Sequence, residues 1–348
     1  MSELALYRKY RPGSFAEVVG QEPIIQVLEG SIKQGTVGHA YLFAGARGTG
    51  KTSVARIFAR ELDTSPDDLY EIDAASSRGI DEIRELREAV LTLPFASKYK
   101  VYIVDEVHML TKEAFNALLK TLEEPPAHVI FILATTEFHK LPETIVSRCQ
   151  SFTFRKPGLD ELRTVITNAA KAEGRKLDLA ATDLIALLGD GSYRDALGVL
   201  QKAFGATANK KITADLVASV SGAPPGELIF QFIEGLVSRD TDATLGVVKR
   251  AADAHRDPRI FLKLTLNLIR AAMFLKFAPA VGREIITPFA EAERQFVERL
   301  AARPESTALS LILRELLVTY DELGRSYLPE LPLELAILRI VGLLAKQV

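Results

Sequence analysis

A glycine-rich segment that directly follows an apolar run constrains the fold of this chain more than any other feature. The run His39–Ala44 has the pattern of a buried strand and leads into Gly45–Thr52, a complete GxxxxGKT motif. Residues Gly50–Leu62 then have the pattern of a helix. In this setting the motif forms a phosphate-binding loop, whose backbone N–H groups converge at the helix N-terminus. The sequence therefore predicts an α/β domain that binds ATP or GTP.

The residues of the loop have expected places at the nucleotide. Lys51 would lie beside the β- and γ-phosphates, and the Thr52 hydroxyl would be a ligand of Mg²⁺. The residues expected to contact the nucleotide are Gly45, Ala46, Arg47, Gly48, Thr49, Gly50, Lys51, Thr52 and Ser53.

Further apolar runs alternate with helical segments. Leu69–Ile72, Val101–Val104 and Val129–Ala134 predict three more strands, and Asp81–Val90 and Lys112–Leu122 predict helices between them. Buried strands that are continuously apolar and separated by helices are typical of a mainly parallel sheet that is covered on both faces.

Two carboxylates follow the strand predicted at Val101–Val104. Ligands of open α/β sheets bind at the carboxyl ends of the strands, so Asp105 is expected beside the phosphates, where it would hold Mg²⁺ directly or through water. Glu106 would be the base that orients and polarises the attacking water. An Asp-Glu pair after a strand is otherwise a solvated turn, but the phosphate loop upstream favours hydrolysis.

Beyond Lys156–Gly158 little resembles a strand, and apolar residues recur at three- and four-residue intervals. The predicted helices are Leu159–Glu173, Ala180–Leu188, Arg194–Phe204, Leu228–Ser238, Ala243–Ala254, Arg259–Phe277, Ile286–Leu300, Thr307–Tyr320 and Leu333–Lys346. The Pro- and Gly-rich break Ala223–Gly226 separates the first three from the others. We therefore expect domains over residues 1–156, 157–221 and 222–348.

Charge and cysteine content exclude several classes of protein. With 43 Lys and Arg against 45 Asp and Glu, the net charge is −2, so nucleic acid would be met only by a local basic surface. The single cysteine allows neither an internal disulfide nor a cysteine-rich zinc site, which indicates a reducing compartment.

No segment has the pattern of a secretion signal or a membrane span. Residues 1–11 mix charge with tyrosines. Val129–Ala134 is too short for a bilayer, and Leu331–Ala345 contains Glu334 and Arg339, whereas a spanning helix needs about 20 mainly apolar residues. We expect a cytoplasmic protein with no membrane partner.

Several motifs together resemble one protein family. They are Tyr10–Pro12 with Phe15 and Val18–Gln21, the phosphate loop, Asp105–Leu110, Asn116–Pro126, Ala134–Thr136, Ser147–Cys149 and Gly191–Ala196. These motifs are similar to those of the γ/τ subunits of bacterial DNA polymerase III, AAA+ ATPases that drive the sliding-clamp loader. The resemblance is close over residues 4–205 and looser beyond. It implies an AAA+ domain, then a helical lid and an all-α collar through which subunits assemble.

The resemblance also implies roles for residues outside the loop. Thr136 matches sensor 1, and Arg194 matches sensor 2, which reaches the phosphates from the lid. Arg148 matches the arginine finger, which completes the ATP site of the neighbouring subunit and offsets transition-state charge. The residues that match the family's adenine site are Tyr7, Arg11, Pro12, Val18 and Val19. The Val18–Val19 pair fits an ordinary core equally well, and the choice of adenine over guanine rests on the resemblance.

Expected partners follow from the same resemblance. Primer–template DNA would be held through its phosphates, at positions that in isolation are routine solvated residues: Arg78, Lys112, Lys120 and Thr144. The other expected partners are further loader subunits in a pentameric ring, or copies of this chain when it is alone, and the sliding clamp. The polymerase core would bind through C-terminal regions missing here. A nucleoid-associated cytoplasmic location is implied, and nothing resembles a polymerase active site.

The chain departs from the family in two places. Most members insert a four-cysteine zinc module where Leu62–Asp68 crosses the gap in a few residues, so we expect no zinc. The chain also ends at Val348, where relatives usually continue, which suggests a truncated or a natural short form.

Two other classes remain open. The first is another AAA+ DNA motor, such as a branch-migration helicase, which shares the early Arg-Pro and Val-Gly-Gln motifs. Such a motor should end in a winged-helix domain, and Gly222–Val348 lacks the short strands for one. A loader scaffold that does not hydrolyse ATP is the second, and the intact Lys51, Thr52, Asp105 and Glu106 oppose it.

Overall fold

The structure is a computed structural model that describes residues 4–76, 85, 86, 88–304, 308–324 and 326–345. The chain forms two compact units, and each is described by itself. The first unit comprises residues 1–169 and 189–198, and the second comprises residues 170–188 and 199–348. The three expected domains stay a prediction.

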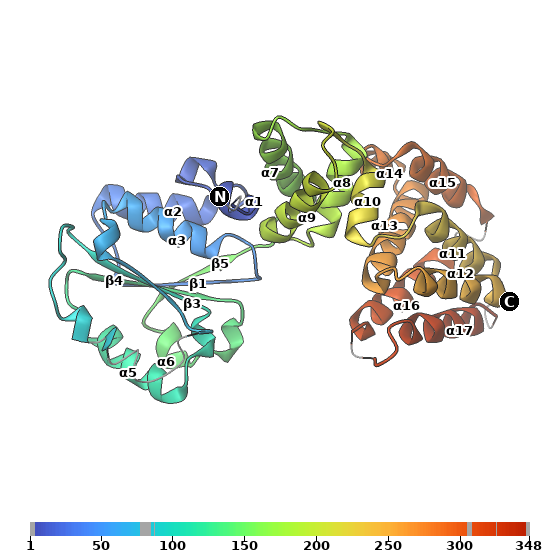
Figure 1. The fold of residues 1–348 in the computed structure, drawn as a ribbon. Helices are drawn as coiled ribbons and strands as arrows, with labels where there is room; N and C mark the ends of the chain where they lie inside the picture. Colours follow the sequence, from blue (N-terminus) through green and yellow to red (C-terminus); the bar gives the residue numbers. More distant parts are fainter. Residues whose placement is uncertain (1–3, 77–84, 87, 305–307, 325, 346–348) are drawn as a thin grey trace. The chain divides into compact units, whose positions relative to one another are not determined.

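The first unit is built on a five-stranded sheet in which every pairing is parallel (Figure 1). Its strands are β1 (Ala40–Gly45), β2 (Leu69–Asp73), β3 (Lys100–Asp105), β4 (Val129–Thr135) and β5 (Gln150–Phe154), in the order β2-β3-β4-β1-β5. The parallel α/β fold and the four predicted strands are confirmed. The strand β5 was not predicted, because this edge strand alternates buried Phe152 and Phe154 with exposed polar residues.

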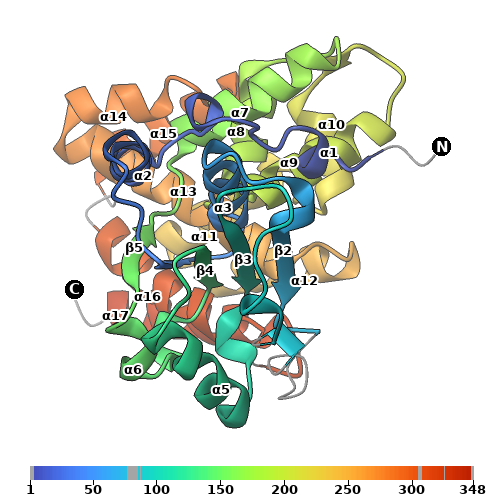
Figure 2. The same ribbon diagram turned by 90° about the vertical axis from the view of Figure 1, so that its left-hand side faces the viewer.

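Helices cover both faces of this sheet, as its residue pattern requires. Leu42 of β1 packs in one core, and Tyr41 and Phe43 pack in the other, since successive side chains of a strand point to opposite faces. Figures 1 and 2 show α2 (Glu22–Gln34) and α3 (Lys51–Glu61) over one face. The other face is covered by α5 (Lys112–Glu123) and α6 (Glu143–Val146). The helices before and after this sandwich are α1 (Leu6–Lys9), α7 (Leu159–Ala172) and α9 (Tyr193–Gly205).

The second unit is mainly helical, as predicted. Its helices include α8 (Leu179–Leu188), α10 (Ala214–Ser221), α11 (Gly226–Ser238), α12 (Thr241–Asp253), α13 (Pro258–Phe277), α14 (Pro279–Ile286), α15 (Glu291–Ala302), α16 (Leu309–Glu322) and α17 (Leu331–Ala345). Phe232, Phe261 and Phe296 are fully buried in its core.

Two predictions for this unit were wrong. Strands do occur after residue 158, because β6 (Lys176–Leu177) and β7 (Lys211–Ile212) pair in parallel over two residues, too short a length to produce a pattern. One helix was predicted over Ile286–Leu300, but α14 and α15 are separate there. Pro288 lies in the break, where it has no backbone N–H group to continue the hydrogen bonds of α14.

No single helix among the described residues is long and apolar enough to cross a membrane. The pair α10 and α11 passes that test only when taken together, and the two helices are bent by 79° at their junction.

Candidate nucleotide site

A cavity of about 780 Å³ opens at the carboxyl ends of β1 and β3, entirely within the first unit. Its lining comes from the N-terminal segment, the phosphate loop, the end of β3, α7 and α9. The predicted site residues that line it are Tyr7, Arg11, Pro12, Val18, Val19, Arg47, Gly48, Thr49, Gly50, Lys51, Thr52, Ser53, Asp105, Glu106 and Arg194. A volume of this size fits a ligand as large as a nucleotide.

The phosphate loop holds a buried lysine beside an open helix end. Lys51 is only 5% exposed, and its Nζ donates to the carbonyls of Gly45 and Ala46 at 2.7 and 3.0 Å. Burial lowers the pKa of Lys51, and the charges of Glu106 and Asp105 partly oppose that change. No described side chain caps the N-terminus of α3, which leaves its first N–H groups free for an anion. These residues fit a nucleoside triphosphate.

Glycine is required at two points of this loop. Gly48 has a φ of +75°, and a Cβ there would lie 2.0 Å from Ser192 Oγ. Gly50, at the start of α3, has a φ of +103°. Both values lie in the left-handed half of backbone space, which side chains disfavour.

The side chains expected at a metal ion meet in the structure. Thr52 Oγ1 donates to Asp105 Oδ2 at 2.8 Å, across 53 residues of sequence. Hydroxyl and carboxylate oxygens are the hard ligands that Mg²⁺ prefers, so the pair fits this ion.

The carboxylate of Glu106 is held by Thr136. The Thr136 N–H and hydroxyl donate to Glu106 Oε2 at 3.2 and 2.9 Å. Glu106 itself adopts a left-handed conformation, with φ 49° and ψ 43°, an uncommon backbone for a non-glycine residue. The two residues follow β3 and β4, which are neighbours in the sheet, so the topology brings them together. Their catalytic roles stay predictions.

The N-terminal segment and α9 meet at the cavity. Tyr193 Oη donates to the carbonyl of Val19 at 2.7 Å. The Arg194 guanidinium lies 4.8 Å from the centre of the Tyr7 ring. Arg8 chiefly, and Arg194 to a smaller extent, lower the pKa of Tyr7. Tyr7 and Val19, which were predicted at the base-binding site, and Arg194, which was predicted as sensor 2, therefore line the same cavity. Their roles at the nucleotide stay predictions.

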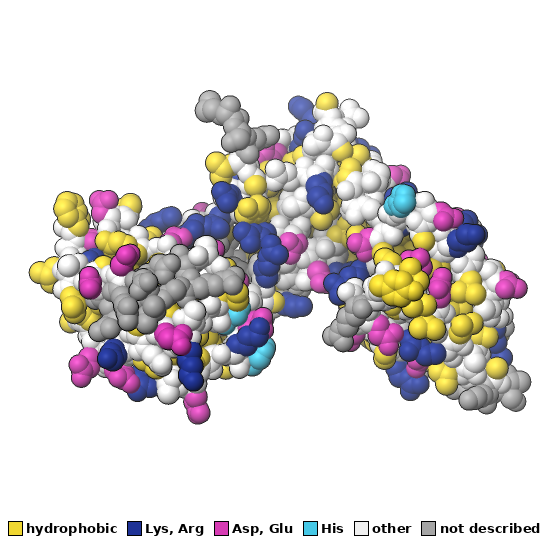
Figure 3. Space-filling model, turned by 60° about the horizontal axis from the view of Figure 1, so that its bottom comes forward, with side chains coloured by type: hydrophobic (Ala, Val, Ile, Leu, Met, Phe, Trp, Pro, Cys, Tyr) yellow, Lys and Arg dark blue, Asp and Glu magenta, His cyan; other side chains and the backbone are white. Residues whose placement is uncertain are grey.

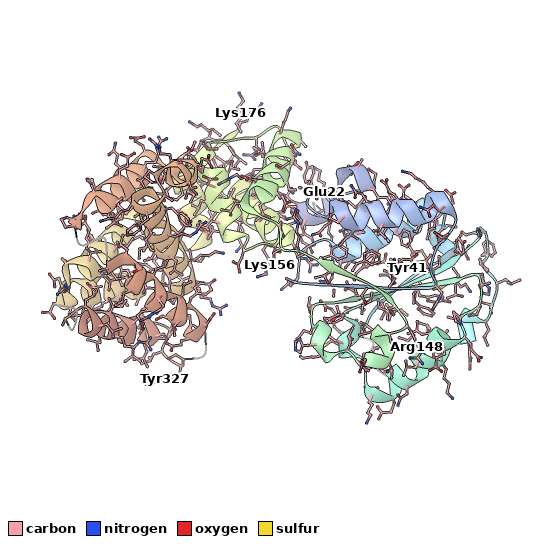
Figure 4. All side chains as sticks on the ribbon, turned by 180° about the vertical axis from the view of Figure 1, so that it is seen from behind. Glu22, Tyr41, Arg148, Lys156, Lys176 and Tyr327 are labelled. Carbon is pink, nitrogen blue, oxygen red and sulfur yellow. The ribbon has the colours of Figure 1, made fainter. Side chains whose placement is uncertain are left out.

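Some predicted site residues lie elsewhere. Gly45 and Ala46 do not line the cavity, and they contribute through the carbonyls that bind Lys51. Arg148 also lies outside the lining, on the side of the sheet with α5 and α6, whereas Glu22 lies on the side with α2 (Figure 4).

The predicted DNA-binding positions are exposed where the structure describes them. Lys112 and Lys120 lie two turns apart on α5, and Thr144 lies on α6, which packs beside it. Lys and Arg side chains are interspersed with Asp and Glu over this side of the first unit (Figure 3). Arg78 lies outside the described residues.

Sequence reasoning missed several features of this unit. Further residues line the cavity, among them Arg8, Tyr193 and Leu197. The only sequence signal for Arg8 and Tyr193 was that each adjoins a predicted site residue. His108 was also missed: its Nδ1 lies 2.9 Å from Thr135 Oγ1 and 3.5 Å from Glu106 Oε2.

A further feature that was not predicted is an exposed apolar segment, formed by Leu91, Leu93 and Phe95. These side chains are 74, 77 and 85% exposed. They precede β3 and therefore lie toward the amino ends of the strands, at the edge of the sheet opposite the nucleotide cavity. Three large exposed apolar side chains within five residues form an apolar patch, a feature that is common at partner-binding surfaces.

Asp68 orders this segment from its position directly before β2. Its buried carboxylate accepts the backbone N–H groups of Phe95, Ala96 and Ser97 at 2.6, 2.9 and 2.8 Å. Burial alone would raise the pKa of Asp68, but these N–H groups hold it at about 2. The carboxylate therefore stays charged, and its contribution to stability is lost only as the pH falls from about 4 toward 2.

Two more side chains at strand starts hold the same segment. Lys100, only 4% exposed, begins β3 and donates Nζ to the Ala89 carbonyl at 3.0 Å and to Thr92 Oγ1 at 2.7 Å. His128, just before β4, places Nε2 3.1 Å from the carbonyls of Val90 and Thr92. The exposed apolar segment is therefore anchored from three adjacent strands.

The fold and the phosphate loop define the first unit as an AAA+ nucleotide-binding domain. A solved structure of Thermotoga maritima RuvB, described as a Holliday junction branch migration motor, matches with a TM-score of 0.53 and 23% identity. The match covers 66% of this chain and 79% of that one, and at this identity it shows the fold alone.

Sequence comparison gives the family. Residues 20–71 and 63–158 match the family "DNA polymerase III, delta subunit", and residues 212–347 match "DNA polymerase III subunits gamma and tau domain III". DNA polymerase III subunit tau of Bacillus subtilis is 37% identical over 98% of this chain, and subunit gamma of Buchnera aphidicola is 31% identical over 99%. The chain belongs to the γ/τ subunit family of bacterial DNA polymerase III. It spans 63% of the B. subtilis relative and 98% of the Buchnera relative.

Proposed function

We propose that this chain is an ATP-hydrolysing motor subunit of a DNA polymerase III clamp loader. ATP binding and hydrolysis would drive the opening of the sliding clamp and its loading onto primer–template DNA. The observation that carries the proposal is the meeting of Lys51, the Thr52–Asp105 pair and Glu106 at one cavity. A scaffold subunit has no need of these groups, and family membership opposes a branch-migration helicase.

Each residue of the site would have its own role in ATP hydrolysis. Lys51 and the free N–H groups of α3 bind the phosphates. Mg²⁺, held by Thr52 and Asp105, would offset the charge that develops on the phosphate oxygens. Glu106 orients and polarises the attacking water, and Thr136 fixes the carboxylate of Glu106 for that task.

Subunit contacts and DNA complete the proposed cycle. Arg194 would report the nucleotide state to the lid, and Arg148 would enter the site of the next subunit in a pentameric ring. DNA phosphates would bind at Lys112, Lys120, Thr144 and, outside the described residues, Arg78. We infer that the collar assembles the ring and that the protein works in the cytoplasm at the nucleoid.

ATP turnover measured with and without primed DNA and clamp tests this proposal. We expect primed DNA and clamp together to raise turnover at least several-fold. Lys51→Ala should lose nucleotide binding, because the phosphates lose the buried ammonium group of the loop. Turnover that ignores both DNA and clamp would contradict the loader function, and turnover retained in Lys51→Ala would contradict the site.

The sliding clamp is the occupant that we propose for the exposed apolar segment. Leu91, Leu93 and Phe95 carry no charge to attract DNA phosphates, and contacts from Asp68, Lys100 and His128 hold the backbone of their segment. Preorganisation of this kind lowers the entropic cost of binding a protein partner.

Replacing Leu93 and Phe95 together with serine should weaken clamp binding by tenfold or more, since each buried side chain contributes about 1.5–3 kcal/mol. Affinity for labelled clamp in the presence of a non-hydrolysable ATP analogue measures the effect. Val27→Ser, on the exposed surface of α2, is the matched control, with Val27 46% exposed. Unchanged clamp affinity in the double variant would remove the segment from the interface.

A further inference from the structure

The guanidinium group of Arg148 is held at both ends by its own chain. Nη2 donates to Glu123 Oε1 at 2.7 Å, and Nη1 donates to the Thr144 carbonyl at 2.8 Å. The side chains of Arg148 and Glu123 are 34 and 48% exposed, so the pair is accessible from outside. Glu123 is the last residue of α5, and Arg148 lies just after α6. The contact therefore joins residues that are 25 apart in the sequence.

Both partners of Arg148 belong to helices that pack against the sheet. The helix α5 is fixed to the sheet by buried side chains that include Ala114, Leu118 and Leu122, one residue before Glu123. The Thr144 carbonyl belongs to α6, whose Ile145 is fully buried in the same core. A guanidinium has five N–H groups, so these two contacts leave others free for an oxyanion.

We propose that Glu123 is a positioning residue for Arg148, which it holds in the orientation that reaches the neighbouring subunit's ATP. The inference rests on the proposed function of Arg148 in trans. An arginine side chain that is free in solvent must give up rotamer freedom to reach a phosphate, whereas one already held by two contacts has little left to lose.

The ion pair between Arg148 and Glu123 contributes little to the stability of the fold. An ion pair between exposed side chains contributes about 0–1 kcal/mol to stability, so its loss leaves the fold intact. A displaced catalytic group can nevertheless cost up to about 100-fold in rate. The Glu123 carboxylate therefore acts on turnover in the ring rather than on the folding of one subunit.

Glu123→Gln and Glu123→Ala in the assembled loader test the inference. With primed DNA and clamp present, we expect Glu123→Ala to lower kcat about tenfold and leave the KM for ATP unchanged, an effect within the range for misplaced groups. Glu123→Gln keeps an acceptor oxygen and should lose less. The thermal midpoint and the nucleotide affinity of the subunit should stay as in the parent protein. Glu124→Gln, at the exposed neighbouring glutamate, is the matched control and should leave kcat unchanged.

The double variant Glu123→Ala with Arg148→Ala should be no slower than Arg148→Ala, because Glu123 acts only through Arg148. An unchanged or raised kcat in Glu123→Ala, while Arg148→Ala is severely slowed, would overturn the positioning role and leave the proposed function intact. An Arg148→Ala variant of normal kcat would overturn both.

Discussion

Glu106→Gln is expected to lose DNA-stimulated ATP hydrolysis by about 10²–10⁴-fold, the range for removal of a general base. The amide cannot take a proton from water, but it can still accept a hydrogen bond from Thr136, whose N–H and hydroxyl meet Glu106 Oε2 in the structure. Lys51 and the Thr52–Asp105 pair are untouched, so the variant should bind ATP with nearly normal affinity. Single-turnover hydrolysis and fluorescent-nucleotide binding, measured on the same preparation, check both parts.

Glu137→Gln is the matched control for this experiment. Glu137 is a nearby carboxylate that pairs with Lys140 at 3.0 Å, and it is not among the residues that line the cavity. Its substitution should leave hydrolysis unchanged. A Glu106→Gln subunit that hydrolyses ATP near the normal rate would show that another group serves as the base.

Arg148→Ala is expected to lose hydrolysis by about 10³-fold, at the lower end of the effect of a trans-acting arginine in GTPases. Arg148 does not line the cavity of its own chain, where Glu123 and the Thr144 carbonyl bind its guanidinium. Each variant subunit should therefore bind ATP normally. Equilibrium nucleotide binding to the isolated subunit and steady-state turnover of the assembled loader measure the two properties separately.

Mixed rings provide the decisive comparison. A subunit with Arg148→Ala retains Glu106, and a subunit with Glu106→Gln retains Arg148, so one type of interface in a mixed ring contains both groups. Co-assembled rings should recover part of the activity that either variant lacks alone. Arg163→Ala, at a partly exposed arginine that pairs with Asp160 on α7, is the control and should keep full turnover. Co-assembled rings without any recovery would contradict action in trans.

Local sequence was sufficient for much of the fold and for the phosphate loop. The strands β1, β3 and β4 are buried along nearly their whole length, so their continuous apolar runs are visible in sequence. The edge strand β5 has one exposed side, and Pro288 divides a helical pattern that otherwise looks continuous. Such features depend on neighbouring strands or on single residues, so the apolar periodicity of the sequence does not show them.

The sequence by itself determined the nucleotide loop, because glycine conformation, helix N-terminus and Lys51 all act within a few residues. Only the tertiary structure decided what meets across the sheet. Thr136 binds Glu106 because β3 and β4 are neighbours, and Glu123 binds Arg148 because α5 packs beside α6. The anchoring of the exposed apolar segment likewise depends on the parallel order of β2, β3 and β4, which brings Asp68, Lys100 and His128 to one edge. These contacts join residues 25 or more apart in most cases, and no local pattern records such pairings.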